Sequence, residues 1–320
     1  MQKETGVAKS SGLLDHRMES NNFEEIPVID IQDVFSSDAL ARRTLANRIR
    51  DACINVGFFY VANHGIPQSV IEDALAAGKR FFALPQDAKA LLDIHKSPNF
   101  KGYTPLLGEN TDPANRGDLH EGFDIGWEDL AGISRSDDGV MTGDNVWPEA
   151  LPGFREAVLQ YYHAVVKLGK ALFPLFALAL DLPENFFDDK TTKPAAIMRL
   201  LHYPPQTGVL DERVLGIGAH TDYECFTILW QDSNVQALQV LNNSRKWIDA
   251  VPIPGTFVVK AVNRSGIERY SIPLFFGTDY NVKLEALPSC VSEDCPAKYP
   301  VVTAGEYVKS RLEATYAHSK

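Results

Sequence analysis

The sequence predicts a mainly β fold with a helical N-terminal part. Apolar residues recur at helical spacing through much of the chain up to about residue 182. From Ala195 onward, short β-prone runs alternate with turns rich in Pro, Gly and Asn. No internal repeat or low-complexity linker separates the two halves, and 320 residues with 45% hydrophobic content can bury a full core. We therefore expect the halves to form one compact unit.

The predicted organisation has four regions. A polar, flexible tail covers residues 1–25, because this stretch holds too few apolar residues to fold by itself. A helix-rich region, 26–190, packs on the β-rich core, 191–285, and a C-terminal segment follows at 286–320.

The elements of the helix-rich region follow from local patterns. Residues 26–31 alternate like a short strand, and 37–56 carry apolar residues at the steps expected of a helix packed on one face. Residues 57–61 are aromatic and β-branched, which predicts a strand. Further helices are expected to begin after Pro67 and after Pro85.

The stretch 97–145 is dense in Gly, Pro, Asn and Asp and is predicted to be a long loop. It nevertheless holds large apolar side chains, so it is expected to pack over something. A lid over a substrate and a loop covering the core are both open. These side chains include Tyr103, Leu106, Leu107, Phe123 and Trp127.

A long amphipathic helix is predicted over 152–182 and is stopped by Pro183. The periodicity then changes to that of short strands, which suggests an antiparallel barrel or sandwich. The predicted strands cover 197–203, 217–221, 225–230, 238–240, 247–250, 256–259 and 269–276.

Composition argues against several classes of partner. A formal net charge of -11 opposes binding to nucleic acid or to an anionic lipid surface. The N-terminus has no apolar segment of signal-peptide length, so we expect a cytoplasmic protein without a membrane span, and a monomer. The four cysteines show no CxxC spacing, which predicts incidental free thiols.

His220, Thr221 and Asp222 form the first candidate site. On a strand, residues two apart share a face, so His220 and Asp222 would offer one imidazole and one carboxylate to a single ion. A non-haem Fe(II) site uses two imidazoles and one carboxylate, with positions left open for cosubstrate and dioxygen. The alternative is a His and an Asp on the surface of a barrel strand.

Arg269 and Ser271 show the same spacing within the predicted strand 269–276. An Arg that faces into a barrel is costly unless it pairs with an anion, and a nearby hydroxyl adds a donor to the same anion. This pair is therefore a candidate carboxylate clamp, although an Arg bonded to a structural Asp or Glu is the alternative. The His-x-Asp triplet upstream favours the clamp.

At these residues the chain resembles the Fe(II)- and 2-oxoglutarate-dependent dioxygenases, in the branch that includes isopenicillin N synthase and the plant flavonoid and gibberellin oxygenases. The sequence of the long loop, GYTPLLGENTDPANRGDLHEGFDIG, is most similar to that of fungal members. The resemblance runs from Ile26 to about Leu284 and implies a double-stranded β-helix, or jelly roll, with a helical N-terminal part. Its motifs are IPVIDI, GFFYVANHGI, GYTPLLGENTDPANRGDLHEGFDIG, RLLHYPPQ, GAHTDYECFTIL and RYSIPLFF.

The resemblance also implies roles for individual residues. His220 and Asp222 would be the first two iron ligands, with no catalytic residue beyond the metal site. Arg269 and Ser271 would hold the distal carboxylate of 2-oxoglutarate, assisted by Tyr203. Fe(II), 2-oxoglutarate and dioxygen would together hydroxylate or desaturate a small metabolite, with release of succinate and CO2, in secondary or heterocycle metabolism.

The same comparison suggests the walls of the substrate pocket. Plant relatives often carry Asn two positions before the tyrosine, where this chain has Leu201. The pocket would be lined by residues of the long loop and by one residue after the clamp, although all could equally be core. These candidates are Tyr103, Leu106, Phe123 and Phe275.

The chain departs from the family pattern after Val259. In the family the second ligand histidine lies ten positions before the clamp arginine, where this chain has Val259, and a segment that relatives carry there is missing. The only histidine after His220 is His318. A carboxylate such as Asp249 or Glu268 is an alternative ligand. Either the gene model or splice form dropped an in-frame segment, or the chain is a real degenerate member of the family.

Three functions therefore stay open. The chain is an oxygenase, a non-catalytic relative that binds a metabolite or partner, or a 2-oxoglutarate-independent iron oxidase. A shortened barrel would also leave strand groups unpaired, which predicts reduced stability.

Overall fold

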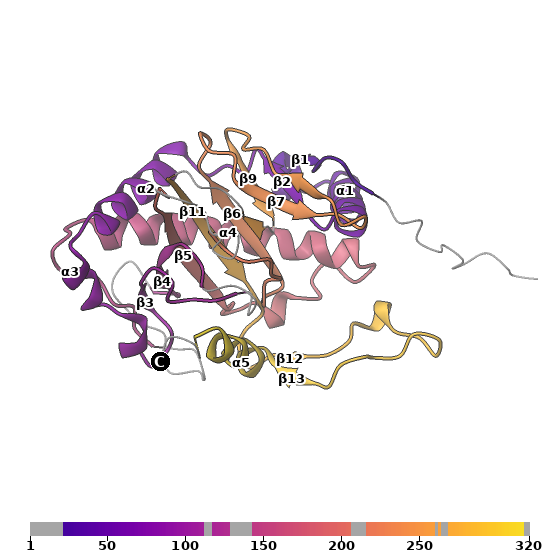
Figure 1. The fold of residues 1–320 in the computed structure, drawn as a ribbon. Coiled ribbons are helices and arrows are strands. Elements are labelled where there is room, and N and C mark those ends of the chain that lie inside the picture. Colours follow the sequence, from indigo (N-terminus) through magenta and orange to yellow (C-terminus); the bar gives the residue numbers. More distant parts are fainter. Residues whose placement is uncertain are drawn as a thin grey trace, which may run out of the picture.

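A computed structural model describes residues 22–111, 117–128, 143–205, 216–259, 262–263 and 268–316. Its main sheet has eight strands, antiparallel except where β1 and β2 pair, and it occupies the centre of the molecule (Figure 1). In spatial order the strands are β1 (Val28–Asp30), β2 (Phe59–Ala62), β9 (Thr256–Val259), β6 (Phe226–Gln231), β11 (Arg269–Phe276), β5 (Ala196–Tyr203), β4 (Glu121–Ile125) and β3 (Gly102–Thr104).

Two smaller sheets account for the other described strands. In the first, β7 (Leu238–Leu241) pairs with β8 (Trp247–Asp249) and with the two-residue β10 (Val262–Asn263). In the second, β12 (Lys283–Leu284) pairs with β13 (Val302–Thr303).

The helices pack mainly on one face of the main sheet. α1 (Ala39–Asn55) and α2 (Gln68–Phe82) contact the long α4 (Phe154–Ala179), which runs across the sheet behind its strands (Figure 1). α5 (Ala304–Tyr316) lies below the sheet, beside β12 and β13 (Figure 1). The short helices are α3 (Gln86–Ala90), η1 (Gln32–Phe35), η2 (Ile94–Lys96), η3 (Asp188–Lys190) and η4 (Pro288–Cys290).

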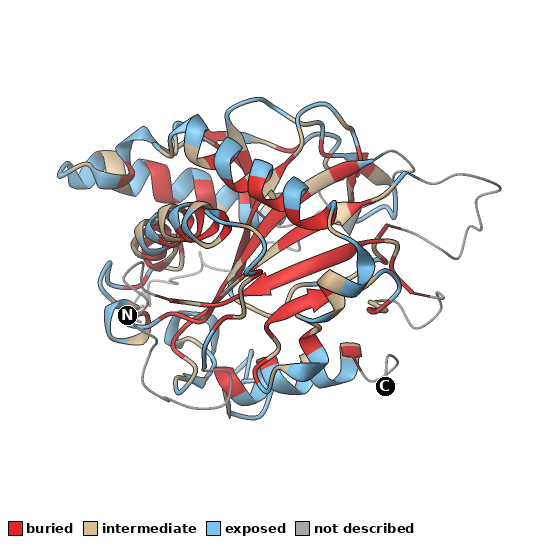
Figure 2. Ribbon diagram, turned by 90° about the vertical axis from the view of Figure 1, so that its left-hand side faces the viewer, coloured by how far each residue is buried: buried red, intermediate tan, exposed pale blue. Residues whose placement is uncertain are grey.

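The two faces of the central strands have different roles because side chains alternate along a strand. One face joins the helices in the apolar core, and Figure 2 shows the buried residues concentrated in the strands and on the inner sides of the helices. The opposite face lines a cavity. On β5 the core residues are Ala196, Met198 and Leu200, and the cavity residues are Ile197, Arg199, Leu201 and Tyr203. On β11 the core residues are Ile272, Leu274 and Phe276, and the cavity residues are Arg269, Ser271, Pro273 and Phe275.

α4 is the central helix of the core. It is long and apolar enough to span a membrane by length and composition, but 61% of its most apolar stretch is buried within the protein. Gly169 brings the helix close to β11, since a Cβ there would lie 2.4 Å from the ring of Phe276. The helix ends at Ala179, before the predicted stop at Pro183.

Parts of the predicted organisation are wrong. The stretch 97–145 is not a single loop, because β3 and β4 within it pair with each other and β4 pairs with β5. Residues 217–221 form no strand. Local sequence suggested otherwise because strand formation depends on partners far away in the chain.

The junction after Val259 crosses between two sheets. β9 pairs with β2 and β6 and ends at Val259, and β10 then joins β7 of the small sheet. Lys260 and Ala261 lie outside the described residues. Val259 itself is buried in the apolar core. The predicted loss of stability from a shortened junction stays a prediction.

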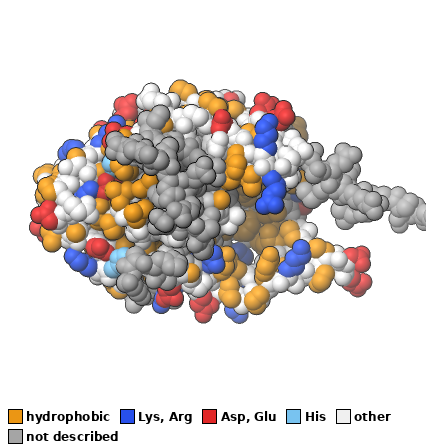
Figure 3. Space-filling model, viewed as in Figure 1, with side chains coloured by type: hydrophobic (Ala, Val, Ile, Leu, Met, Phe, Trp, Pro, Cys, Tyr) orange, Lys and Arg blue, Asp and Glu red, His pale blue; other side chains and the backbone are white. Residues whose placement is uncertain are grey.

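On the face seen in Figure 3, the basic side chains of the described residues are scattered among acidic and apolar ones. All four cysteines are free. The predicted tail, 1–25, lies largely outside the described residues, which begin at Asn22.

Candidate functional site

A cavity of about 110 Å³ lies on the face of the main sheet that is turned away from α4. Its walls come from β4, β5, β6 and β11, from the segment 217–224 that precedes β6, and from α5. Its lining includes both His220 and Asp222 and both Arg269 and Ser271. The fold therefore brings the two candidate sites of the sequence into one space.

His220 and Asp222 approach each other at this cavity. His220 Nε2 lies 3.4 Å from Asp222 Oδ1, and His220 Nδ1 is 2.8 Å from the carbonyl oxygen of Gly218. Donation from Nδ1 to that carbonyl leaves Nε2 available as a ligand. The Thr227 hydroxyl donates to Asp222 Oδ2. One imidazole nitrogen and one carboxylate oxygen thus face a common position, which suits a metal ion.

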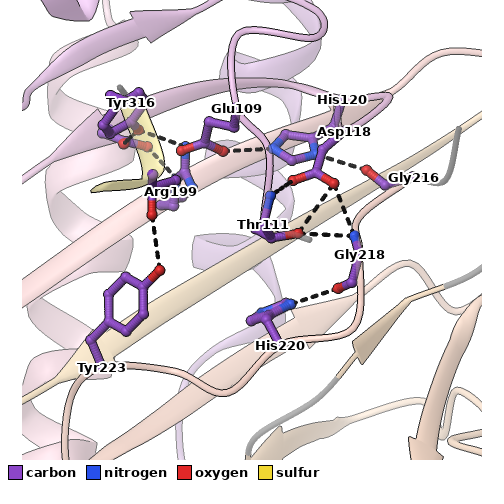
Figure 4. A network of polar contacts seen from close by, with 12 residues as sticks. Glu109, Thr111, Asp118, His120, Arg199, Gly216, Gly218, His220, Tyr223 and Tyr316 are labelled. Carbon is purple, nitrogen blue, oxygen red and sulfur yellow. Dashed lines mark hydrogen bonds and ion pairs between the residues drawn. The ribbon is translucent and has the colours of Figure 1, made fainter. Parts of the chain in front are cut away.

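The sequence predicted that a strand would place His220 and Asp222 on one face. The structure has no strand at these residues, so other contacts bring the two side chains together. The backbone N–H of Gly218 donates to Asp118 Oδ1 at 2.9 Å and to the Thr111 hydroxyl at 3.0 Å (Figure 4). His120 Nδ1 donates to the carbonyl oxygen of Gly216 at 2.8 Å. These side chains from another part of the chain fix the backbone that carries His220, and the sequence analysis missed them.

Burial shapes the protonation of the acidic and basic groups here. Burial lowers the pKa of His220, but contacts with Asp222 and Gly218 outweigh it and hold this pKa above its ordinary value. Burial, assisted by the charge of Asp222, raises the pKa of Glu224 to about 8. Both pKa shifts favour the protonated forms of His220 and Glu224, so a cation that bound here would displace protons from these groups.

Arg269 is a buried cation without a full set of partners. Its side chain is 3% exposed, and its Nε has no hydrogen-bond partner in the described part of the chain. The guanidinium lies over the Tyr203 ring, 4.1 Å from the centroid, because the two residues pair directly across β11 and β5. Burial lowers the pKa of Arg269 despite this contact. An anionic ligand would satisfy the guanidinium, and the buried Ser271 lies on the same face of β11.

The residues present fit 2-oxoglutarate better than they fit iron. Among the described residues, no group of three His, Cys, Asp or Glu side chains could hold a metal ion. Val259 is in the core, and Asp249 and Glu268 are exposed and do not line the cavity. His318 lies outside the described residues. In the described segments, the donors available to Fe(II) at this cavity are therefore His220 and Asp222, two of the usual three ligands.

Only one of the four predicted pocket residues lines the cavity. Phe275 lines the cavity, and so does Leu201, which stands directly opposite Ser271. Tyr103 and Phe123 are instead buried in the core with the helices, because they lie on the core face of β3 and β4. Leu106 is 42% exposed and does not line the cavity.

Sequence reasoning also missed three charged residues in the cavity wall, Glu109, Asp124 and Arg199. One signal could have found Arg199. It lies four positions before Tyr203 on a largely apolar strand, so the two share a face.

Comparisons with known proteins show the family of this chain. Residues 26–150 match the family model described as the N-terminal region of non-haem dioxygenases in morphine synthesis, and residues 194–267 match that of the 2OG-Fe(II) oxygenase superfamily. The chain is 35% identical to the 2-oxoglutarate-Fe(II) type oxidoreductase hxnY of Emericella nidulans, covering 92% of this chain and 91% of the relative. It is 36% identical to the oxidoreductase ppzC of Metarhizium majus, covering 90% and 87%.

Solved structures show the same similarity. A full-length Neurospora crassa protein in complex with alpha-KG and thymine superposes with a TM-score of 0.78 at 27% identity, covering 90% of this chain and 96% of that one. A 2OG-Fe(II) oxygenase family protein from Caulobacter crescentus gives 0.76 at 26% identity, covering 91% and 99%. The predicted jelly-roll core with a helical N-terminal part is confirmed.

Proposed function

Because this chain belongs to the 2OG-Fe(II) oxygenase superfamily, we propose that it binds 2-oxoglutarate through Arg269 and oxidises a small metabolite in the adjoining cavity. The cofactors of this family are Fe(II) and 2-oxoglutarate. The observation that carries the proposal is the buried, incompletely paired Arg269 in the same cavity as His220 and Asp222. His220 and Asp222 would hold the iron, which would supply the dioxygen chemistry by which this family hydroxylates or desaturates a substrate with release of succinate and CO2.

The residues of this chain bind and orient the cosubstrate. Arg269 pairs with the distal carboxylate of 2-oxoglutarate and Ser271 adds a hydroxyl donor. The Tyr203 ring holds the guanidinium in place from the neighbouring strand. The apolar Leu201 and Leu229 line the cavity and exclude water around the charged pair, which strengthens it.

The substrate in this proposal is a small, heterocyclic or secondary metabolite. The thymine complex of the Neurospora crassa protein supports a ring-containing substrate, because that protein is similar over 90% of this chain. We further propose membership of the isopenicillin N synthase-like branch, and a cytoplasmic monomer that acts without nucleic acid or membrane.

We propose in addition that the chain lacks the family's distal ligand histidine. The buried, apolar Val259 and the two-donor site at His220 and Asp222 support this. A second candidate function follows, in which the chain binds 2-oxoglutarate without turnover. The transcript sequence across the codons for Val259 and Lys260 separates a lost segment, which would contain a histidine codon, from an uninterrupted join.

Binding of 2-oxoglutarate tests the clamp, by isothermal titration calorimetry. Arg269→Gln is expected to weaken binding about a hundredfold, because loss of a buried charged partner costs roughly 2–5 kcal/mol. Arg48→Gln, on the exposed surface of α1, is the matched control and should bind normally. Equal affinity of Arg269→Gln and the unaltered protein would refute the clamp.

Iron and product measurements separate the three functions. An oxygenase binds Fe(II) more tightly than its His220→Ala variant and releases succinate in step with product. A non-catalytic relative binds 2-oxoglutarate, but its Fe(II) affinity is the same with and without His220. A 2-oxoglutarate-independent oxidase forms product without succinate.

A further inference from the structure

A charged group lines the cavity beside the proposed cosubstrate site. Arg199 on β5 and Asp124 on β4 stand directly opposite each other across the two strands. Glu109, from the segment after β3, reaches the same place. All three line the cavity that holds His220, Asp222 and Arg269. We call Arg199, Asp124 and Glu109 the polar wall.

The polar wall lies to one side of the cosubstrate site. Arg269 and Ser271 are on β11, and Thr227, which holds Asp222, is on the next strand, β6. β5 and β4 follow on the opposite side of β11, and each strand adds about 4.8 Å. A cosubstrate between Arg269 and Asp222 therefore lies over β11 and β6. The space over β5 and β4 is left for a second molecule.

Short contacts hold the polar wall together, and those that join Arg199, Glu109 and His120 can be followed in Figure 4. Arg199 Nε donates to Asp124 Oδ1 at 2.7 Å, and Arg199 Nη2 lies 2.9 Å from Glu109 Oε1. Glu109 Oε2 in turn accepts from His120 Nε2 at 2.9 Å. Tyr316 of α5 places its hydroxyl 3.4 Å from Arg199 Nη2.

The charges of this network balance. His120 Nδ1 donates to the carbonyl oxygen of Gly216, and one proton lies between His120 Nε2 and Glu109 Oε2, so the His120–Glu109 pair carries no net charge. The charge of Arg199 is balanced by the carboxylate of Asp124. A charged ligand group placed here would add one uncompensated charge in a buried site, which is costly.

Two atoms of the polar wall keep hydrogen-bonding capacity. Arg199 Nη1 has no hydrogen-bond partner in the described segments of the chain. Asp124 Oδ2 accepts only a long contact of 3.5 Å from the Tyr316 hydroxyl. The wall thus offers a donor and an acceptor from neighbouring residues.

We propose that Arg199 and Asp124 select the primary substrate, and that its polar end is a neutral group with an acceptor beside a donor, such as an amide, lactam or imide. The acceptor of this group receives a hydrogen bond from Arg199, and its donor bonds to Asp124. Phe100, Ile197 and Leu312 give the rest of the substrate apolar walls. The proposal rests on the proposed function only in placing this substrate beside a cosubstrate at Arg269.

Three isosteric probes test this selection, namely neutral benzamide, anionic benzoate and cationic benzamidine. Their affinities for the full-length protein are measured by calorimetry, with and without saturating 2-oxoglutarate, which keeps benzoate away from Arg269. Benzamide is expected to bind at least tenfold more tightly than either charged probe. Binding of benzoate or benzamidine as tight as that of benzamide overturns the proposal, and so does absence of binding by all three.

Two charge-changing variants separate selection from a purely structural role. Asp124→Asn makes the polar wall more positive and is expected to shift the preference toward benzoate. Arg199→Gln makes it more negative and is expected to shift the preference toward benzamidine. Each shift should be about tenfold or more, as for removal of one charged partner. Circular dichroism checks the fold, and Asp189→Asn on the exposed η3 is the control.

The outcomes also distinguish the two proposals. Loss of 2-oxoglutarate binding with retained benzamide preference would refute the proposed function and leave the polar wall intact. Normal 2-oxoglutarate binding with probe preferences that do not follow the charge of the variants would refute the polar wall alone.

Discussion

Residues on neighbouring strands contact each other in the cavity, and one of them holds the other in position. Arg269 is the buried cation of the proposed clamp, and Tyr203 lies beneath it on the next strand. A cation over an aromatic ring contributes up to about 2 kcal/mol when both are removed from water. Tyr203 therefore keeps the guanidinium in position before any ligand binds.

Substitution of Tyr203 separates the role of the ring from that of the hydroxyl. Tyr203→Leu removes the ring and is expected to weaken 2-oxoglutarate binding about 10- to 30-fold, in line with the roughly 2 kcal/mol of a buried cation–π contact. Tyr203→Phe keeps the ring and should lose less affinity for 2-oxoglutarate than Tyr203→Leu. Calorimetric dissociation constants provide the measurement, and equal losses in the two variants would contradict the role of the ring.

At the level of elements, the packing of α4 on β11 depends on a glycine. A Cβ on Gly169 would lie 2.4 Å from the Phe276 ring, whereas one on Gly78 of α2 would lie 3.8 Å from Leu200, an ordinary contact. Helical glycines are thus not equivalent. Gly169 is required because α4 approaches β11 closely at this point, whereas Gly78 leaves room for a Cβ.

Alanine at these two glycines should have opposite effects on stability. Alanine gains about 0.5–1 kcal/mol in a helix, but overpacking costs about 1–3 kcal/mol. Gly169→Ala is therefore expected to lower the free energy of unfolding by about 1–2 kcal/mol, and Gly78→Ala to raise it slightly. Urea unfolding of the two variants checks this, and a stabilised Gly169→Ala protein would count against the observed packing.

Four elements meet at Glu121 of β4. Its carboxylate accepts hydrogen bonds from Lys89 of α3 at 2.6 Å, from the Tyr103 hydroxyl of β3 at 2.6 Å and from His202 of β5 at 2.8 Å. Burial alone would raise the pKa of Glu121, but these partners outweigh it and lower the pKa from its usual value of 4.5.

The lowered pKa of Glu121 predicts a pH-dependent contribution to stability. A group whose pKa is lower in the folded state stabilises the fold above its unfolded pKa, near 4.5, and loses this as the pH falls further. Glu121→Gln is expected to lower the free energy of unfolding by about 2–3 kcal/mol at pH 7 and by progressively less below pH 4.5. Urea unfolding across this range measures the effect, with Glu313→Gln on the exposed side of α5 as control. A cost independent of pH would exclude the charge as its source.

At the scale of the whole molecule, the cavity joins distant parts of the chain. Its walls come from the main sheet, the segments around residues 109 and 220, and α5 near the C-terminus. Tyr223 and Thr315 share a hydrogen bond of 2.9 Å between the segment after Asp222 and α5. A ligand in this cavity therefore stabilises the protein as a unit.

Thermal unfolding should report this coupling. At a hundred times its dissociation constant, 2-oxoglutarate adds about 2.7 kcal/mol, which is expected to raise Tm by roughly 3–6 °C. Pyruvate, which lacks the distal carboxylate, should raise it less at equal concentration. An equal shift in the Arg269→Gln variant would show that the stabilising ligand binds elsewhere.

The sequence by itself determined the family and the regular elements with strong local patterns. β9 and β11 match their predicted bounds, and β5 differs by one residue, because each is an apolar run bounded by turn residues. The same local reasoning failed for 217–221 and for β3 and β4. Hydrogen bonds from residues far away in sequence decide these segments, and no local pattern encodes such partners.

Only the tertiary structure decided which side chains share the cavity. His-x-Asp and Arg-x-Ser were visible as motifs, and so was Val259 at the position where the family resemblance leads one to expect a histidine. The polar wall was not, because Glu109, Asp124 and Arg199 come from separate segments and their charges balance only when the sheet brings them together. Motifs depend on short spacing along the chain, whereas a substrate site depends on distances in space.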